Sequence, residues 1–123
     1  MTTLGSFQNH LDLYKKFKRD AENPGNYEGT RVEAYFLSGF QLIEACAAME
    51  RVHINKHQNI RTVLEQNRFI FGENTDTVWR SFQKIGNQLR PKFAYGVTWT
   101  DEDLNDVVRM YGVMEAACLE KLK

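Results

Sequence analysis

The sequence predicts an all-α fold, an antiparallel up-and-down bundle of about four long helices plus one short helix. Three observations support this prediction. Apolar residues recur at spacings of three and four along most of the chain. Pro- and Gly-containing turns separate these segments, and no segment shows the apolar–polar alternation of a convincing strand. A chain of 123 residues has room for one hydrophobic core, so we expect a single domain over residues 1–123.

The first two helices have the clearest patterns. One apolar face of the first is formed by Leu4, Phe7, Leu11, Tyr14 and Phe17. This helix should stop at residues 23–26, because Pro24 has no amide hydrogen and Gly25 tolerates a turn. A second helix is expected from about Gly29 to Met49. It is apolar over more than one stripe, so we expect it to lie at the centre of the bundle.

The next two helices are separated by short apolar and polar connections. Residues 53–57 should lead to a short third helix near residues 59–65, whose inward residues are Ile60, Val63 and Leu64. We expect residues 69–71 to end this unit as an apolar plug. Asn74 or Thr75 should cap a fourth helix, which Pro91 ends or bends. The inner stripe of this helix is predicted to be Val78, Phe82, Ile85 and Leu89.

The last part of the chain is predicted to be an aromatic loop over residues 92–99 and a final helix. Thr100 should cap this helix, and three acidic residues follow it in the first turn. Its apolar stripe is Leu104, Val107, Tyr111, Met114, Cys118 and Leu122. Small residues flank Cys46 and Cys118, and Gly39 and Gly112 lie further along the same two helices. We therefore predict that the second and last helices pack closely and that both cysteines are buried and reduced.

Composition and charge exclude several classes of protein. Hydrophobic residues make up 42% and charged residues 26%, as in ordinary soluble globular proteins. No apolar run approaches the ~20 residues of a membrane helix, and no signal-peptide pattern is present. We therefore expect a cytoplasmic protein without membrane contact. Two cysteines are too few for a disulfide scaffold or a four-cysteine metal site.

The net charge is zero, but the charges are unevenly distributed. Residues 51–92 carry eight basic and three acidic side chains, a net charge of +5. This segment could bind an anion, or it could be a solvated face paired with the acidic ends of the chain.

The segment 87–96 carries the main candidate ligand-binding residues. Arg90 lies one position beyond Leu89, at the edge of the predicted core. Its planar guanidinium suits a phosphate, the Asn87 amide suits a base or sugar, and aromatic rings offer stacking faces. Alternatively, Arg90 donates to free carbonyls at the helix end and Tyr95 plugs the mouth of the bundle. Our candidate nucleotide- or phosphate-binding residues are Asn87, Arg90, Lys92, Tyr95 and His53.

A weaker alternative is a metal site. Glu50, His53 and His57 would share one helical face if the second helix continued through them, and their side chains could hold zinc or iron. Val52 and Ile54 indicate that the helix ends there instead. We find no nucleophile motif, no Gly-rich phosphate loop and no paired carboxylates. The sequence therefore predicts neither a catalytic residue nor a cofactor.

The order of these features resembles that of a known family. The run Glu33–Ala45 (EAYFLSGFQLIEA) is followed by a basic turn with two histidines and by a short helix that Phe71-Gly72 closes. The next helix ends near Asn87 and Arg90, Tyr95-Gly96 follows it, and the last helix is amphipathic. Over about residues 30–123 this resembles small prokaryotic HEPN (higher-eukaryote and prokaryote nucleotide-binding) domains. The resemblance implies a helical bundle that often dimerises, with a ligand or RNA site near the dimer cleft. Many members are RNA-cutting toxins or effectors, frequently encoded beside a small nucleotidyltransferase.

One feature of active HEPN members is missing here. They carry an arginine and a histidine separated by four to six residues, but no histidine follows Arg90. Arg51 and His57 have this spacing, but they lie between the second and third helices. The resemblance therefore implies a domain that binds a nucleotide or RNA without the RNase activity of the family. Two alternatives remain: an interaction or homodimerisation bundle acting as a toxin–antitoxin or complex partner, and a metal-dependent enzyme using Glu50, His53 and His57.

Overall fold

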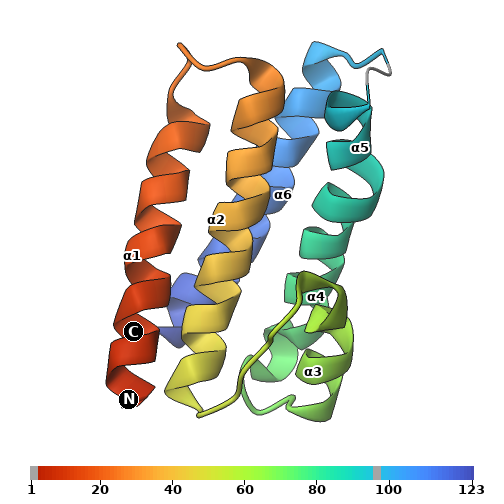
Figure 1. The fold of residues 1–123 in the computed structure, drawn as a ribbon. Helices are drawn as coiled ribbons and strands as arrows, with labels where there is room; N and C mark the ends of the chain where they lie inside the picture. Colours follow the sequence, from red (N-terminus) through yellow and green to blue (C-terminus); the bar gives the residue numbers. More distant parts are fainter. Residues whose placement is uncertain (1–2, 96–97) are drawn as a thin grey trace.

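The computed structural model describes residues 3–95 and 98–123, and it confirms the all-α prediction (Figure 1). Gly96 and the side chain of Leu4, both named above, lie outside the described part. The α-helices are α1 (Thr3–Glu22), α2 (Glu28–Met49), α3 (Ile60–Gln66), α4 (Thr75–Gln83), α5 (Arg90–Ala94) and α6 (Asp101–Lys121). Single 3₁₀ turns at His57–Asn59 and Gly72–Asn74 precede α3 and α4, and a π-helical segment, Lys84–Leu89, joins α4 to α5.

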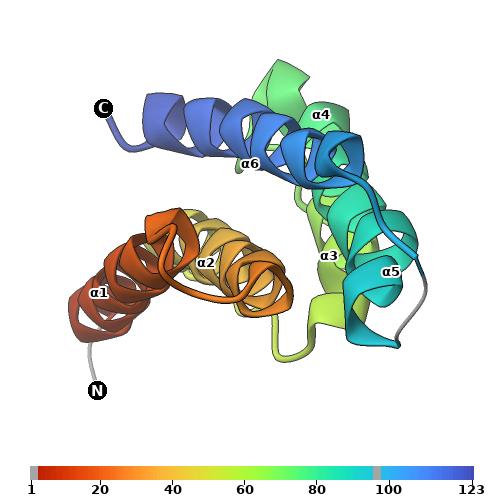
Figure 2. The same cartoon turned by 90° about the horizontal axis from the view of Figure 1, so that it is seen from above.

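The helices form an up-and-down bundle with α2 at its centre. In Figure 1, α1 runs upward and α2 downward, α4 and α5 form one ascending column, and α6 descends behind α2. Contacts join α2 to α1, α6 and α5, while α3 packs on α4. Figure 2 shows α6 lying across one side of the bundle, where it contacts α2 and α4. The predicted central position of the second helix is therefore confirmed.

The predicted contact between the second and last helices is present. The Cys46 thiol donates a hydrogen bond to the backbone carbonyl of Cys118, with 3.5 Å between sulfur and oxygen, and both cysteines are buried and free. Gly39 lies against Met114 of α6, where a Cβ would overlap the Met114 methyl group. The expectation for Gly112 is wrong, because this residue lies on the exposed face of α6 and an added Cβ would meet no described atom within 4 Å.

A polar network ties α1, α2 and α6 together inside the bundle. The Ser38 hydroxyl donates to the backbone carbonyl of Tyr14 at 2.9 Å and lies 2.8 Å from the Tyr111 hydroxyl. The Tyr14 hydroxyl donates to Glu115, which also pairs with Lys18 at 2.7 Å. Burial, and then the carboxylate of Glu115, raise the pKa of Tyr14. These buried polar groups are paired with one another, as a stable interior requires.

The two predicted helix caps have different outcomes. Thr100 forms a capping box with Asp103: its hydroxyl accepts from the Asp103 amide at 3.2 Å, and Asp103 accepts from the Thr100 amide at 2.9 Å. Asn74 occupies the N-cap position of α4, but neither it nor Thr75 makes a side-chain capping bond. The Thr75 hydroxyl donates to the carbonyl of Gly72 instead. Within the predicted apolar plug, Ile70 and Phe71 are buried, whereas Phe69 is 62% exposed, so that part of the prediction is wrong.

The chain beyond Leu89 departs from the prediction. The inner stripe of the predicted fourth helix is buried as expected, but Pro91 does not end this helix. The backbone amide of Arg90 donates to the carbonyl of Ile85, five residues earlier, and α5 then starts with Pro91 in its first turn. The missing amide hydrogen of proline costs little at that position. Residues 92–94 are therefore helical, and the expected loop starts only at Tyr95.

No helix in the described ranges has the length and apolarity needed to cross a bilayer.

Candidate functional site

Arg90 stands where α5 meets α2, at the edge of the core as predicted. Its Nε and Nη2 donate to the two carboxylate oxygens of Glu33, at 2.6 and 3.0 Å. Its Cζ lies 4.4 Å from the centroid of the Phe36 ring. The Glu33 hydrogen bonds raise the pKa of Arg90 above its ordinary value. The alternative in which Arg90 donates to carbonyls at the helix end is therefore wrong.

A cavity of about 190 Å³ lies beside this guanidinium. It is lined by Phe36, His57, Gln58, Phe82, Gln83, Gly86, Asn87 and Arg90. We call it the Arg90 cavity. The rings of Phe36 and Phe82 stack with their centroids 4.8 Å apart, and His57 packs edge-on against Phe36 at 5.1 Å. Two of the predicted ligand-binding residues, Asn87 and Arg90, thus share one cavity with a histidine from a distant part of the chain.

The π-helical segment supplies one side of the Arg90 cavity. Gln83, Gly86, Asn87 and Arg90 are spaced by three and four residues, so they lie along one face of the α4–α5 column. Gly86 is required by the close approach to α2, because a Cβ there would lie 2.8 Å from Phe36 Cε1. The cavity therefore depends on this glycine and on the position of Phe36.

The other three candidate residues lie elsewhere. Lys92 pairs with Asp103 at 2.9 Å and connects α5 to the start of α6. The Tyr95 ring is 80% exposed, so it does not plug the mouth of the bundle. His53 is exposed in the turn after α2. None of the three lines the Arg90 cavity. For Lys92 the reason is that residues 90–94 continue as a helix, which places its side chain beside Asp103 instead.

The predicted metal site is not formed. The chain leaves α2 at Met49, and Arg51 takes a positive φ of 60°. Glu50 accepts a hydrogen bond from Lys121 at 2.6 Å, while His57 belongs to the Arg90 cavity. Within residues 3–95 and 98–123, no group of three His, Cys, Asp or Glu side chains could hold a metal ion. The end of the helix separates the three residues that a continuous helix would have aligned.

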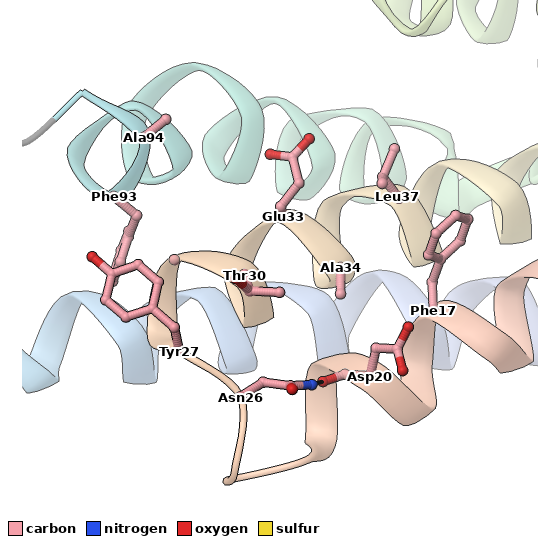
Figure 3. A pocket seen from close by; sticks show the side chains of 11 residues that line it. Phe17, Asp20, Asn26, Tyr27, Thr30, Glu33, Ala34, Leu37, Phe93 and Ala94 are labelled. Carbon is pink, nitrogen blue, oxygen red and sulfur yellow. Dashed lines mark hydrogen bonds between the residues drawn. The ribbon is translucent and has the colours of Figure 1, made fainter.

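A larger groove lies on the other side of the Arg90–Glu33 pair. It has a volume of about 580 Å³ and lies between α1, α2 and α5 (Figure 3). Its lining includes Phe17 and Asp20 from α1, Tyr27 and Glu33 at the start of α2, and Phe93 from α5. We call it the α2 groove. Because Glu33 lines this groove and Arg90 lines the smaller cavity, the ion pair separates the two spaces.

The charge beside the Arg90 cavity is the Arg90 guanidinium, which an ion pair holds in place. Glu33 compensates the charge of Arg90, and two of the five guanidinium N–H groups are used in this pair. The other three donate to no other described residue and can face a ligand or water. The amides of Asn87, Gln58 and Gln83 offer both donors and acceptors around them. The cavity therefore presents a planar array of donors of the kind that suits a small oxyanion, while the Glu33 carboxylate opposes the charge of an anion.

Sequence reasoning did not place Glu33, His57 or the two glutamines beside Arg90. Glu33 carried a usable signal, since it is a carboxylate flanked by the apolar residues Val32 and Ala34, and such a group needs a partner when it is half-buried. His57 carried none, because its place beside Arg90 follows from how α3 and its preceding turn pack against α2 and α4.

Neither a family model, nor a curated protein sequence, nor a solved structure significantly matches this chain.

Proposed function

We propose that this chain is a HEPN-like binding module that holds a phosphate of a nucleotide or RNA in the Arg90 cavity and does not cleave RNA. The observation that carries the proposal is the placement of Arg90. Its guanidinium is fixed by Glu33 and Phe36, with its remaining donors beside Asn87. A pre-positioned guanidinium loses less conformational entropy on binding than a free arginine would.

The size of the cavity limits what enters it. Its 190 Å³ is below the ~300 Å³ at which pockets for small molecules begin. A single phosphate group fits such a space, and the rest of a nucleotide or RNA chain would lie outside, over Asn87 and Gln58. This favours a weak, salt-dependent interaction rather than a tightly enclosed ligand.

Two fluorescently labelled ligands, a single-stranded RNA and ATP, test this proposal. Their binding is measured by fluorescence anisotropy between 50 and 200 mM salt. Arg90→Ala should weaken binding by about 1–3 kcal/mol, and Arg90→Lys should recover only part of it, because lysine lacks the planar fork. The control is Arg109→Ala, which removes the same charge from an arginine whose one ion pair with the described residues is to Asp106 on α6. If Arg90→Ala binds as the wild type does, the proposed site is wrong.

The same samples test the absence of RNase activity. RNA should stay intact over the time of the binding measurement. Cleavage that disappears in His57→Ala would contradict this half of the proposal, since His57 is the histidine that shares the cavity with Arg90.

Homodimerisation is a second candidate function, favoured by the outer face of α6. An exposed line runs along this helix and ends two residues past it, with an acidic start, an apolar middle and a basic end: Asp101, Asn105, Val108, Gly112, Ala116, Leu119 and Lys123. We propose that two copies pair antiparallel about Gly112. This places Asp101 opposite Lys123 of the partner subunit and Val108 opposite the partner's Ala116. A contact of one helix from each copy is small, so the dimer should be weak and concentration-dependent.

Light scattering over a range of concentrations tests the dimer. Asp101→Lys and Lys123→Glu should each weaken it, and the double variant should restore it because the charges are exchanged. Glu73→Lys, an exposed change between α3 and α4, is the control. A strictly monomeric wild type contradicts the proposal. In the genome, an adjacent gene for a small nucleotidyltransferase would support a toxin–antitoxin role for either function.

A further inference from the structure

We infer that the α2 groove is a second binding site, for an organic cation that carries an amine on an apolar body. The site is separate from the Arg90 cavity and would bind a ligand of the opposite charge. Its evidence is the shape, the aromatic walls and the unpaired carboxylate of the groove, and it does not depend on the proposed binding of a phosphate.

The groove has the size and walls of a small-molecule site. Its volume of about 580 Å³ lies within the ~300–1,000 Å³ typical of such sites. One end is walled by Tyr27 and Phe93, the other by Phe17, and Ala34 and Leu37 of α2 form the floor (Figure 3). These groups can surround an aromatic or branched aliphatic body on three sides.

Tyr27 presents its ring to this space. It precedes the first residue of α2, and its side chain lies over Gly29, where a Cβ would come within 2.6 Å of Tyr27 Cε2. Nevertheless, the tyrosine is 62% exposed. Gly29 thus allows the ring to lie close to the backbone of α2 while one face of the ring remains open to the groove.

The charges of the groove favour a cation. Among the described residues, its lining holds two carboxylates, Asp20 and Glu33, and no lysine or arginine. Both oxygens of Glu33 are occupied by Arg90. The Asp20 side chain forms no hydrogen bond or ion pair with the described part of the chain, although its backbone carbonyl accepts from Asn26 at 2.9 Å. In Figure 3 the Asp20 carboxylate points into the groove, beside Phe17 and below Ala34.

These features together select an ammonium group next to an apolar body. In such a ligand the apolar body would contact Tyr27 and Phe93 at one end of the groove. Its ammonium would pair with Asp20 at the other end, near the face of Phe17, which attracts cations through the ring quadrupole. Asn26 and Thr30 offer acceptors for its other hydrogens. A carboxylate ligand would be repelled by Asp20, and a neutral apolar ligand would desolvate Asp20 without compensating its charge.

Three ligands that share one ring system test the inference: tryptamine, its neutral analogue tryptophol, and indole-3-acetate. In titrations followed by calorimetry and by protein NMR shifts, tryptamine should bind at least about fivefold more tightly than tryptophol. Indole-3-acetate should bind least. Equal affinity for tryptamine and tryptophol, or no saturable binding of tryptamine, would overturn the inference.

Two variants separate charge from shape. Asp20→Asn should remove the preference for tryptamine over tryptophol, and it should fold normally because this carboxylate supports no described contact. Asp12→Asn is the matched control: it lies on the same helix, pairs with Gln8 at 2.9 Å and is not part of the groove. Tyr27→Ala should weaken both ligands together. If Asp20→Asn keeps the wild-type preference, the assigned carboxylate is wrong.

Discussion

Arg90 and Glu33, 57 positions apart in the sequence, are joined by two nearly parallel hydrogen bonds that form the wall between two cavities. The pair fixes the guanidinium but also compensates its charge. A glutamine at position 33 would keep an acceptor for the guanidinium and remove only the negative charge, so the first prediction has a definite sign.

Glu33→Gln should strengthen binding of RNA or phosphate in the Arg90 cavity, because the amide leaves the charge of Arg90 uncompensated. The side chains are 33% and 42% exposed, so the pair stabilises the fold by at most about 1 kcal/mol and the gain in affinity should be up to about fivefold. Anisotropy at 50 mM salt measures it. Glu65→Gln, which removes the partner of Arg61 on α3, is the control. An unchanged affinity would mean that the anion does not bind at Arg90.

Substitutions of two glycines should have opposite effects on the free energy of unfolding. Gly39→Ala places a methyl group where the buried Met114 methyl now lies, so it should destabilise the fold by about 1–3 kcal/mol. In Gly112→Ala the added methyl group would lie in open space on the exposed face of α6, so this variant should stabilise the fold by up to about 1 kcal/mol. Urea denaturation of both variants measures the difference. Equal effects would contradict the described packing of α2 against α6.

Both cysteines should react only after unfolding. Cys46 and Cys118 have no exposed surface, and burial raises the pKa of the Cys118 thiol well above its ordinary value. The reactive thiolate of Cys118 is therefore scarce, and burial makes both thiols inaccessible. A chromogenic thiol reagent should label no cysteine in the native protein and two in urea. Rapid labelling of either thiol in buffer would show that α2 and α6 separate readily.

The start of α6 should weaken in acid. The hydrogen bond from Lys92, and then that from the Thr100 amide, lower the pKa of Asp103 below its ordinary value of 3.8. A lowered pKa means that the folded state prefers the charged carboxylate. Its stabilising effect is therefore complete well above pH 3.8 and is lost as the pH falls through 3.8 towards the lower folded value.

Thermal unfolding between pH 2 and pH 7 measures this loss. Asp103→Asn should be less stable than the wild type at pH 7, and the difference should shrink in acid. Glu102→Gln removes a charge from the same turn without a described side-chain partner, so it is the control. A difference that stays constant across the pH range would contradict the assigned pairing with Lys92.

The resemblance to HEPN domains stays a prediction, and so does each function built on it. The structure bears on the placement of the residues: it brings Asn87 and Arg90 together and leaves Lys92, Tyr95 and His53 outside their cavity. The Arg51–His57 spacing was dismissed from the sequence, but His57 itself reaches the Arg90 cavity from another element.

The sequence by itself determined the helices, because their signals are local. Apolar spacing, the Pro24-Gly25 turn and the Thr100 cap act over about four residues, and the structure has each of them within one or two residues of the predicted position. The burial of Cys46 and Cys118 also followed from their stripes. Only the tertiary structure decided the continuation of the helix past Pro91, the pairing of Arg90 with Glu33 and the two cavities on either side of that pair. These depend on how whole helices pack, and a contact between residues 57 positions apart leaves no periodic signal in either local segment.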